Sequence, residues 1–255
     1  MTRPDKHPWL IAHRGARNEA PDNTLAALKA ARAYPIDGIE LDVQLTQDGT
    51  PVLFHDITLS KVGGGRRRVS DLSADELRKL DWGASWGPAF RGELVPTLAE
   101  VLEKYSEATR LLVEIKAHAH DRKAGRVPEL TRRVVDLLRE EVPLDSVHTT
   151  FVLSFDQDVL RQVHEIDDNW NLVLNTNDPS SIGEVDDHIH AYDAPIRTIT
   201  KAFVDRMHAH GKRVMTWSCN NQAQVKRAME AGVDAMMTDK PGWLVDYLGI
   251  EEASS

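Results

Sequence analysis

The sequence predicts a (β/α)8 barrel, that is, a TIM barrel formed by one domain with a small inserted subdomain after the third strand. Short apolar runs alternate with segments of helical periodicity almost throughout, and 255 residues suit one barrel of ordinary size. The runs are continuously apolar, whereas strands with one wet face would alternate apolar and polar residues. They therefore indicate parallel strands buried on both faces.

Eight runs are the strand candidates of this barrel. They cover residues 9–12, 38–43, 52–54, 111–115, 150–153, 172–174, 214–217 and 235–238. Between them, apolar residues recur at helical spacing, as at positions i, i+3, i+4 and i+7 of the segment 98–105. Ser73 with Glu76, and Thr97 with Glu100, have the spacing of capping boxes at helix starts.

Two segments depart from a regular barrel. Residues 47–50 join the second and third strand candidates by a turn that is too short for a crossover helix. Residues from about 57 to 96 form an insertion with its own helix near 74–80, and residues 179–197 are irregular, with a short extended piece at 189–192. We predict one domain, 1–255, that contains this insertion.

Composition restricts the classes of function. Acidic residues outnumber basic ones by 40 to 31, giving a formal charge of −9, which argues against a nucleic-acid partner. Such a protein must supply local positive charge wherever it binds an anion. The single Cys219 cannot form an internal disulfide, and we find neither an export signal nor the roughly 20 apolar residues of a membrane span. These features predict a cytoplasmic protein without a transmembrane segment.

Charged side chains gather at the ends of the first four strand candidates, where a barrel places its catalytic groups. They are His13, Arg14, Glu40, Asp42, His55, Glu114 and Lys116. Later strands end at Ser154-Phe155, Asn175, Trp217 and Thr238-Asp239. Because residues i and i+2 of a strand point the same way, Glu40 and Asp42 should project together.

Three converging carboxylates repel one another unless a cation lies among them. Oxygen-only ligation by Glu40, Asp42 and Glu114 suits one hard divalent ion, Mg²⁺, Ca²⁺ or Mn²⁺, rather than zinc. Arg14 and Lys116 would supply the positive charge for an anionic phosphate group.

Two histidines complete the set. Cleavage of a phosphodiester needs a base and an acid, and His13 and His55 can exchange protons near neutral pH, in an order that the sequence leaves open. We assign Trp217, Asn23 and Phe155 to the substrate pocket. Each motif alone also fits an ordinary turn or ion pair, but charged residues at four successive buried strand ends favour a functional site.

The segments that carry these residues resemble the glycerophosphodiester phosphodiesterase family. The matching segments are 12–15 (AHRG), 20–24 (APDNT), 38–43 (GIELDV), 55–59 (HDITL), 96–98 (PTL), 113–116 (VEIK), 154–155 (SF), 214–217 (VMTW) and 238–241 (TDKP). They stand in family order across nearly the whole chain. Asp22 and the pair Lys61-Val62 depart from the family pattern, which concerns substrate fit.

The resemblance implies a TIM-like barrel with a small subdomain, a divalent cation, and hydrolysis of a small-molecule glycerophosphodiester to sn-glycerol 3-phosphate and an alcohol. The resemblance also implies that the three carboxylates bind the metal ion, that the two histidines act as acid and base, and that the arginine and the lysine bind the phosphate.

Two alternatives stay open. A lysophospholipase D acting on lipid headgroups would need an apolar trough, for which Trp82, Trp86 and Phe90 are candidates; both tryptophans could be core, but we favour a lid. A non-catalytic anion-binding barrel is the other. The sequence leaves open the departing alcohol, the ion, the oligomeric state, and whether water or a substrate hydroxyl attacks.

Overall fold

The computed structural model describes residues 7–250. Eight parallel strands form the barrel: β1 (Trp9–His13), β2 (Gly38–Leu45), β4 (Arg110–Ile115), β5 (Thr150–Ser154), β6 (Asn171–Asn175), β7 (Ala191–Pro195), β8 (Arg213–Trp217) and β9 (Ala235–Thr238). The strand order β1-β9-β8-β7-β6-β5-β4-β2 closes through an additional β1–β2 pairing. The TIM barrel predicted from the sequence is confirmed.

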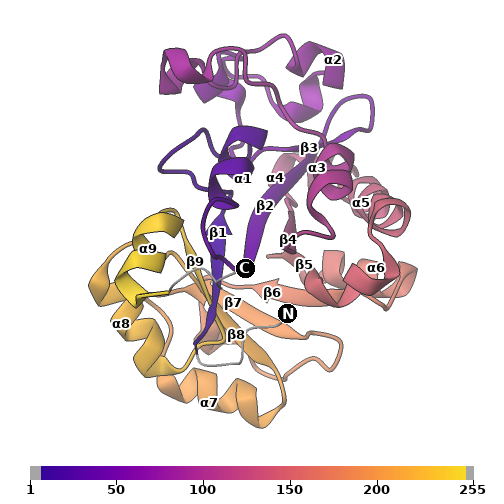
Figure 1. Cartoon of the computed structure of the whole chain (residues 1–255). Helices are drawn as coiled ribbons and strands as arrows, with labels where there is room; N and C mark the ends of the chain where they lie inside the picture. The colour runs from indigo at the N-terminus through magenta and orange to yellow at the C-terminus, as the bar shows by residue number, and fades with distance from the viewer. Residues whose placement is uncertain (1–6, 251–255) are drawn as a thin grey trace.

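Helices surround the barrel (Figure 1). The α-helices are α1 (Leu25–Ala31), α2 (Ala74–Leu77), α3 (Leu98–Tyr105), α4 (Ala119–Lys123), α5 (Val127–Glu141), α6 (Gln157–Ile166), α7 (Lys201–Ala209), α8 (Gln222–Ala231) and α9 (Pro241–Leu248). Short 3₁₀ segments are η1 (Leu59–Val62), η2 (Val69–Asp71), η3 (Ala84–Trp86), η4 (Pro88–Phe90), η5 (Leu144–Thr149) and η6 (Pro179–Ser181). The two predicted capping boxes, at Ser73 and Thr97, start α2 and α3.

The membership of the barrel differs from the sequence prediction at two strands. The run 52–54, counted as a barrel strand, overlaps β3 (Pro51–Leu53), which pairs antiparallel with β2 and stands outside the barrel. The strand that was missed is β7, which begins inside the extended piece expected at 189–192 and reaches Pro195. The count of eight strands was therefore correct although one member was wrong.

Two apolar layers support the site. Strand residues that face outward pack against the helices in one large buried cluster. Residues that face inward, among them Leu112, Phe151, Val173 and Met215, form a second cluster that fills the barrel interior. This packed interior is the floor on which functional side chains at the carboxyl ends of the strands rest.

The inserted segment has a small core of its own. Its apolar side chains pack around Phe54 and Leu59, and it lies at the end of the molecule where α2 is drawn in Figure 1. Trp82 is buried in this core, with its ring 5.0 Å from that of Phe54 in an edge-to-face arrangement. The expectation that Trp82 belongs to a lid is therefore wrong. Trp86 is 40% exposed and packs on Phe90.

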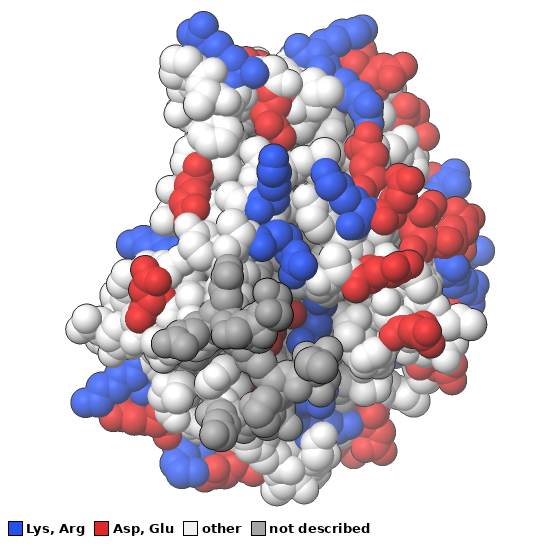
Figure 2. All heavy atoms as spheres, in the orientation of Figure 1, with Lys and Arg blue, Asp and Glu red and all other residues white. Residues whose placement is uncertain are grey.

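The outer surface carries both signs of charge. On the face drawn in Figure 2, acidic and basic side chains are interspersed. Within residues 7–250, no helix combines the length and apolarity needed to cross a bilayer.

Candidate active site

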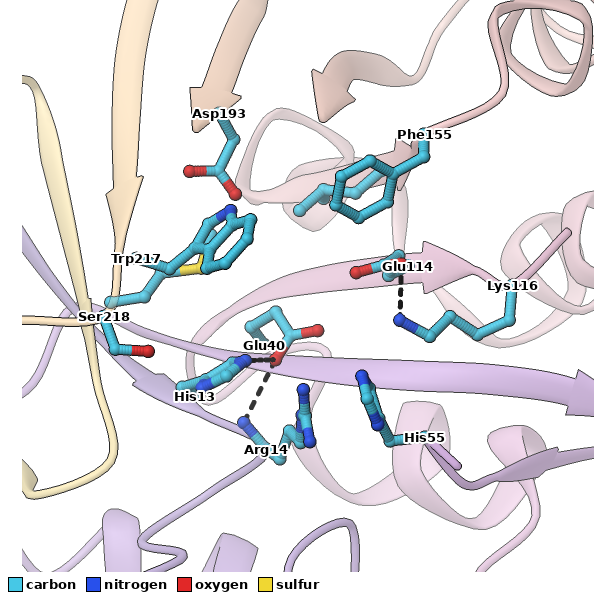
Figure 3. Close-up of a pocket in the computed structure, with 12 residues that line it drawn as sticks. His13, Arg14, Glu40, His55, Glu114, Lys116, Phe155, Asp193, Trp217 and Ser218 are labelled. Carbon is cyan, nitrogen blue, oxygen red and sulfur yellow. Dashed lines mark hydrogen bonds and ion pairs between the residues drawn. The ribbon is translucent and has the colours of Figure 1, made fainter. Parts of the chain in front are cut away.

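A cavity of about 190 Å³ opens at the carboxyl ends of the barrel strands (Figure 3). Its lining residues are His13, Arg14, Glu40, His55, Glu114, Lys116, Leu153, Phe155, Asp193, Trp217, Ser218 and Met237. Figure 3 shows the basic and acidic groups of the first strands on one side, and Asp193, Phe155 and Trp217 on the other. The structure thus brings together eight of the residues that the sequence assigns to the site.

The three carboxylates converge as predicted. Glu40 and Asp42 alternate with apolar residues on β2, and Glu114 comes from the neighbouring β4, where Asp42 and Glu114 are register partners. One oxygen from each of the three lies within 4.8 Å of the others, and all three residues are buried. This group could hold a metal ion.

Burial and mutual repulsion set the charge of this group. Burial, with the nearby Asp42 and Glu114, raises the pKa of Glu40 well above its usual value. Burial likewise acts to raise the pKa of Asp42, but Lys116 and Arg14 outweigh it and hold that pKa well below the usual range. The carboxylates therefore depend on neighbouring positive charge.

The two cations lie against the carboxylates. Lys116 Nζ is 2.6 Å from Glu114 Oε1 and 2.9 Å from Asp42 Oδ1, and Arg14 Nε is 3.0 Å from Asp42 Oδ2. Burial acts to lower the pKa of both cations, but the carboxylates raise both above their usual values. Both side chains therefore stay charged and give this mouth of the barrel two positive groups.

The loop after β1 holds its site residues in unusual backbone conformations. Arg14 and Asn23 have φ values of 60° and 58°, a region that costs non-glycine residues energy and is found at functional sites. At Gly15, whose φ is 80°, a Cβ atom would lie 2.6 Å from the backbone carbon of Ala27, so only glycine lets the loop approach α1.

Asn23 contacts the carboxylate group through Asp42 and is not among the residues that line the cavity, although the sequence assigns it to the substrate pocket. Its side-chain amide donates to Asp42 Oδ2 at 2.8 Å, and its amide oxygen accepts from the Asp42 backbone N–H at 3.1 Å. Asn23 is only 1% exposed. It therefore fixes the position of Asp42.

His13 stands at the end of β1 with a carboxylate partner. Its Nδ1 is 2.7 Å from Asp239 Oδ1, and its Nε2 is 3.8 Å from Glu40 Oε2. Burial lowers the pKa of His13 despite the hydrogen bond with Asp239. Burial acts to raise the pKa of Asp239, but the hydrogen bond with His13 and its charge lower it to about 2. A proton on Nδ1 is thus shared with a carboxylate, which leaves Nε2 for the cavity.

His55 reaches the same cavity from outside the barrel. It follows β3 and Phe54, and its Nδ1 is 2.9 Å from Asp56 Oδ1. The hydrogen bond from His55 lowers the pKa of Asp56 to about 2, against a smaller effect of burial. Lys61 lies 3.4 Å from Asp56 and 2.9 Å from Asp22, so one departure from the family pattern pairs with another.

The wall opposite the carboxylates is largely aromatic. Phe155 and Trp217, both predicted for the pocket, lie edge-to-face with ring centroids 6.3 Å apart. Asp193 on β7 lies beside them, and sequence reasoning missed it because its strand was not identified. Asp239 and Asp56 also received no role, although Asp239 stands directly after a strand candidate and Asp56 follows His55.

Fold and cavity define a TIM barrel with a buried acidic group, two cations and two carboxylate-bonded histidines at one mouth. The Glycerophosphoryl diester phosphodiesterase family matches residues 13–243. The chain belongs to this family of phosphoric diester hydrolases.

Individual relatives match over almost their full length. A glycerophosphodiester phosphodiesterase of Caldanaerobacter subterraneus is 30% identical over 94% of this chain and 97% of its own, and one of Bacillus altitudinis is 28% identical over 91% and 94%. Among solved structures, a phosphodiesterase of Oleispira antarctica superposes with a TM-score of 0.86 at 28% identity, covering 95% of this chain and 97% of that one. That protein was solved in complex with the product sn-glycerol-3-phosphate.

Proposed function

We propose that this enzyme hydrolyses glycerophosphodiesters to sn-glycerol 3-phosphate and an alcohol, using a divalent cation and the pair His13 and His55. The observation that carries the proposal is one small cavity lined by both histidines, both cations and two of the three clustered carboxylates. The product held by the Oleispira antarctica relative supports glycerol 3-phosphate as the product here.

The carboxylate group fits a hard divalent ion. Its donors are oxygens only, and Glu40 Oε1 is buried without a hydrogen-bond partner among the described residues. Such an oxygen is costly to bury unless a cation or a donor meets it. Glu40, Asp42 and Glu114 would hold Mg²⁺, Ca²⁺ or Mn²⁺, and the ion would polarise the phosphoryl group and neutralise developing charge.

Each histidine has the arrangement of a proton-transfer group. Asp239 and Asp56 hold the Nδ1 atoms of His13 and His55, so both rings are oriented and both Nε2 atoms are available for substrate. One histidine would withdraw a proton from the attacking oxygen and the other would protonate the departing alcohol. Their position in one cavity supports this division of work.

Arg14 and Lys116 would bind the phosphate. Both line the cavity, and both form ion pairs with Asp42. A bound divalent ion would neutralise part of the carboxylate charge, so that the two cations could also interact with a phosphate. The guanidinium offers directional N–H donors to phosphate oxygens, while the ammonium acts as a compact charge.

The lysolipid alternative loses part of its sequence support. An acyl chain would need an apolar trough, but Trp82 is buried in the core of the insertion and Trp86 does not line the cavity. The cavity of about 190 Å³ is better matched to a small diester.

The first test is release of glycerol 3-phosphate from glycerophosphocholine and glycerophosphoethanolamine with Mg²⁺, Ca²⁺ or Mn²⁺, and with EDTA. We expect metal-dependent release that falls at least about 100-fold in His13→Ala and in Glu40→Gln, because each removes a group that acts on the reacting phosphate.

Matched controls are His148→Ala and Glu140→Gln, which change exposed residues away from the cavity and should keep wild-type rates. A folded protein that released no glycerol 3-phosphate from either diester with any of the ions would contradict the proposed function. Release that persisted unchanged in EDTA would contradict the role of the ion.

A further inference from the structure

We propose that Asp193 forms a subsite for a hydroxyl group of the glycerol moiety, so that the enclosed half of the cavity receives glycerol and the variable headgroup points outward. This inference rests on the proposed function and adds to it a residue that selects the glycerol half of the diester. Asp193 lies across the cavity from the carboxylate group and the histidines (Figure 3).

The backbone places Asp193 inside the barrel. It is the central residue of β7, paired with Asn175 on β6 and with Met215 on β8. Side chains alternate along a strand, so Asp193 shares the inward face with Ala191, which belongs to the apolar interior cluster. A carboxyl group therefore stands on the inward face of β7, between the polar Asn175 on β6 and the apolar Met215 on β8.

The Asp193 carboxyl group lacks a side-chain partner. The residue is 1% exposed, and its buried Oδ1 has no hydrogen-bond partner among the described residues. Within residues 7–250 no lysine, arginine or histidine lies within 4.0 Å of it. Leaving a buried polar atom unpaired costs about 1–3 kcal/mol, so this geometry calls for a polar ligand group.

The environment favours a neutral ligand group over an ionic one. Burial and the nearby Glu114 raise the pKa of Asp193 well above its usual value. An ionised Asp193 would repel a phosphate group. An ammonium group would bind well only to the ionised form of Asp193, and in the described part of the chain no neighbouring lysine, arginine or histidine stabilises that form. A hydroxyl can both donate and accept, so it pairs with the carboxyl group in either protonation state.

The surrounding side chains match a short polyol. Trp217 and Phe155 form the sides of this half of the cavity, and the apolar side chains of Leu153 and Met237 also belong to the cavity lining. Carbon atoms of glycerol can contact these apolar faces while a terminal hydroxyl reaches the carboxyl group. A trimethylammonium group has neither an O–H nor an N–H donor for the unpaired Oδ1.

The test uses two diesters that differ by one hydroxyl. Glycerophosphocholine is compared with 2-hydroxypropyl phosphocholine, which keeps the 2-hydroxyl and the choline but lacks the terminal hydroxyl. We expect the wild-type enzyme to prefer glycerophosphocholine about 10- to 100-fold in kcat/KM, because a site built to bond a hydroxyl is left with an unpaired group when it is absent.

In Asp193→Ala the preference should fall to about twofold or less, while kcat/KM for 2-hydroxypropyl phosphocholine should stay near the wild-type value. The matched control is Asp187→Ala, which should keep the full preference. Asp187 is exposed, precedes β7 in the chain and is not among the residues that line the cavity. Asp193→Asn, which keeps the shape and a hydrogen-bonding group, should retain part of the preference and shows whether loss in the alanine variant is more than misfolding.

Equal loss on both diesters, or a preference that survives Asp193→Ala, would overturn the inference. The inference would also be overturned if Asp193→Ala lost activity only on diesters with cationic headgroups and kept it on glycerophosphoglycerol, whose headgroup is neutral. Calorimetric binding of glycerol 3-phosphate against 2-hydroxypropyl phosphate separates this result from the proposed function, because the same preference in affinity is expected whether or not turnover occurs. Equal affinities in the wild-type protein would count against the subsite.

Discussion

Asp239 is the residue on which the orientation of His13 depends. Its Oδ1 accepts from His13 Nδ1, its Oδ2 accepts from the side-chain amide of Asn220 at 2.7 Å, and its backbone N–H donates to the Asn220 amide oxygen. A carboxylate fixed in this way selects the histidine tautomer that leaves Nε2 free for the cavity. The role that we propose for His13 therefore also involves Asp239.

Asp239→Asn should lower kcat by about 100-fold with a much smaller change in KM, because an amide can present N–H to Nδ1 and favour the wrong tautomer. Steady-state kinetics with glycerophosphocholine measure this, with Asp168→Asn, an exposed aspartate on another loop, as the control. A change confined to KM would indicate that Asp239 affects substrate binding rather than proton transfer.

The same carboxylate predicts a pH dependence of stability. The folded pKa of Asp239 is about 2 against an ordinary 3.8, so its contribution is fully present above pH 3.8 and is lost as the pH falls towards 2. Allowing for its partial exposure, the contribution is about 1–2 kcal/mol. Urea unfolding should therefore show a cost of Asp239→Asn at pH 6 that shrinks at pH 3; a constant cost would assign the effect to packing.

At the scale of elements, two strands show where sequence patterns succeed and fail. The sequence pattern of residues 52–54 predicts a strand buried on both faces, and the segment is indeed buried. One of its faces, however, packs against the core of the insertion instead of against the helices that surround the barrel. Conversely, Asp193 and Pro195 interrupt the apolar pattern of β7, which concealed a barrel strand. The residue that concealed the strand is Asp193, whose buried Oδ1 has no hydrogen-bond partner among the described residues and for which we propose a role in substrate binding.

The strand-end residues were predictable because their strands have clear apolar patterns on both sides. Charged residues stand out in the sequence when they interrupt strongly apolar strands, as do Glu40, Asp42 and Glu114. The contact of Asn23 with Asp42 could not be predicted from the sequence, because its two hydrogen bonds depend on the positive φ values of the loop after β1. Contacts of this kind follow from the folded backbone rather than from residue spacing.

The insertion supports the site through its core. Trp82 packs edge-to-face on Phe54, the residue before His55. Trp82→Ala should cost about 3–5 kcal/mol in the free energy of unfolding of this segment, because it removes a large buried side chain, and should lower kcat by displacing His55. Trp86→Ala changes a 40% exposed ring in the same segment and should cost less than about 1 kcal/mol with little effect on activity.

Chemical denaturation and steady-state kinetics on the two tryptophan variants check this contrast. If Trp86→Ala lowered activity on glycerophosphocholine more than Trp82→Ala, a role of Trp86 over the substrate would replace the structural account.

On the scale of the whole molecule, three apolar clusters must unfold together if the chain is one domain. Two of them share the strands of the closed barrel, and the third belongs to the insertion, whose β3 pairs with β2 of the barrel. A barrel has no free edge at which strands can separate one by one, so its opening should be cooperative. The insertion joins this unit through β3 and through Phe54.

Cys219 can report on that cooperativity. The chain has one cysteine, which is fully buried after β8 with its N–H bonded to the Met237 carbonyl, and burial raises the pKa of its thiol to about 12. A buried, protonated thiol does not react, so labelling in native buffer at pH 8 should be at least about 1,000-fold slower than in the unfolded chain. In a urea titration, the midpoint of Cys219 labelling should coincide with the midpoint of tryptophan fluorescence, to which Trp82 and Trp86 of the insertion and Trp9, Trp170, Trp217 and Trp243 of the barrel all contribute. A fluorescence change that precedes labelling, and that disappears in Trp82→Ala, would mean that the insertion unfolds first and is a separate cooperative unit.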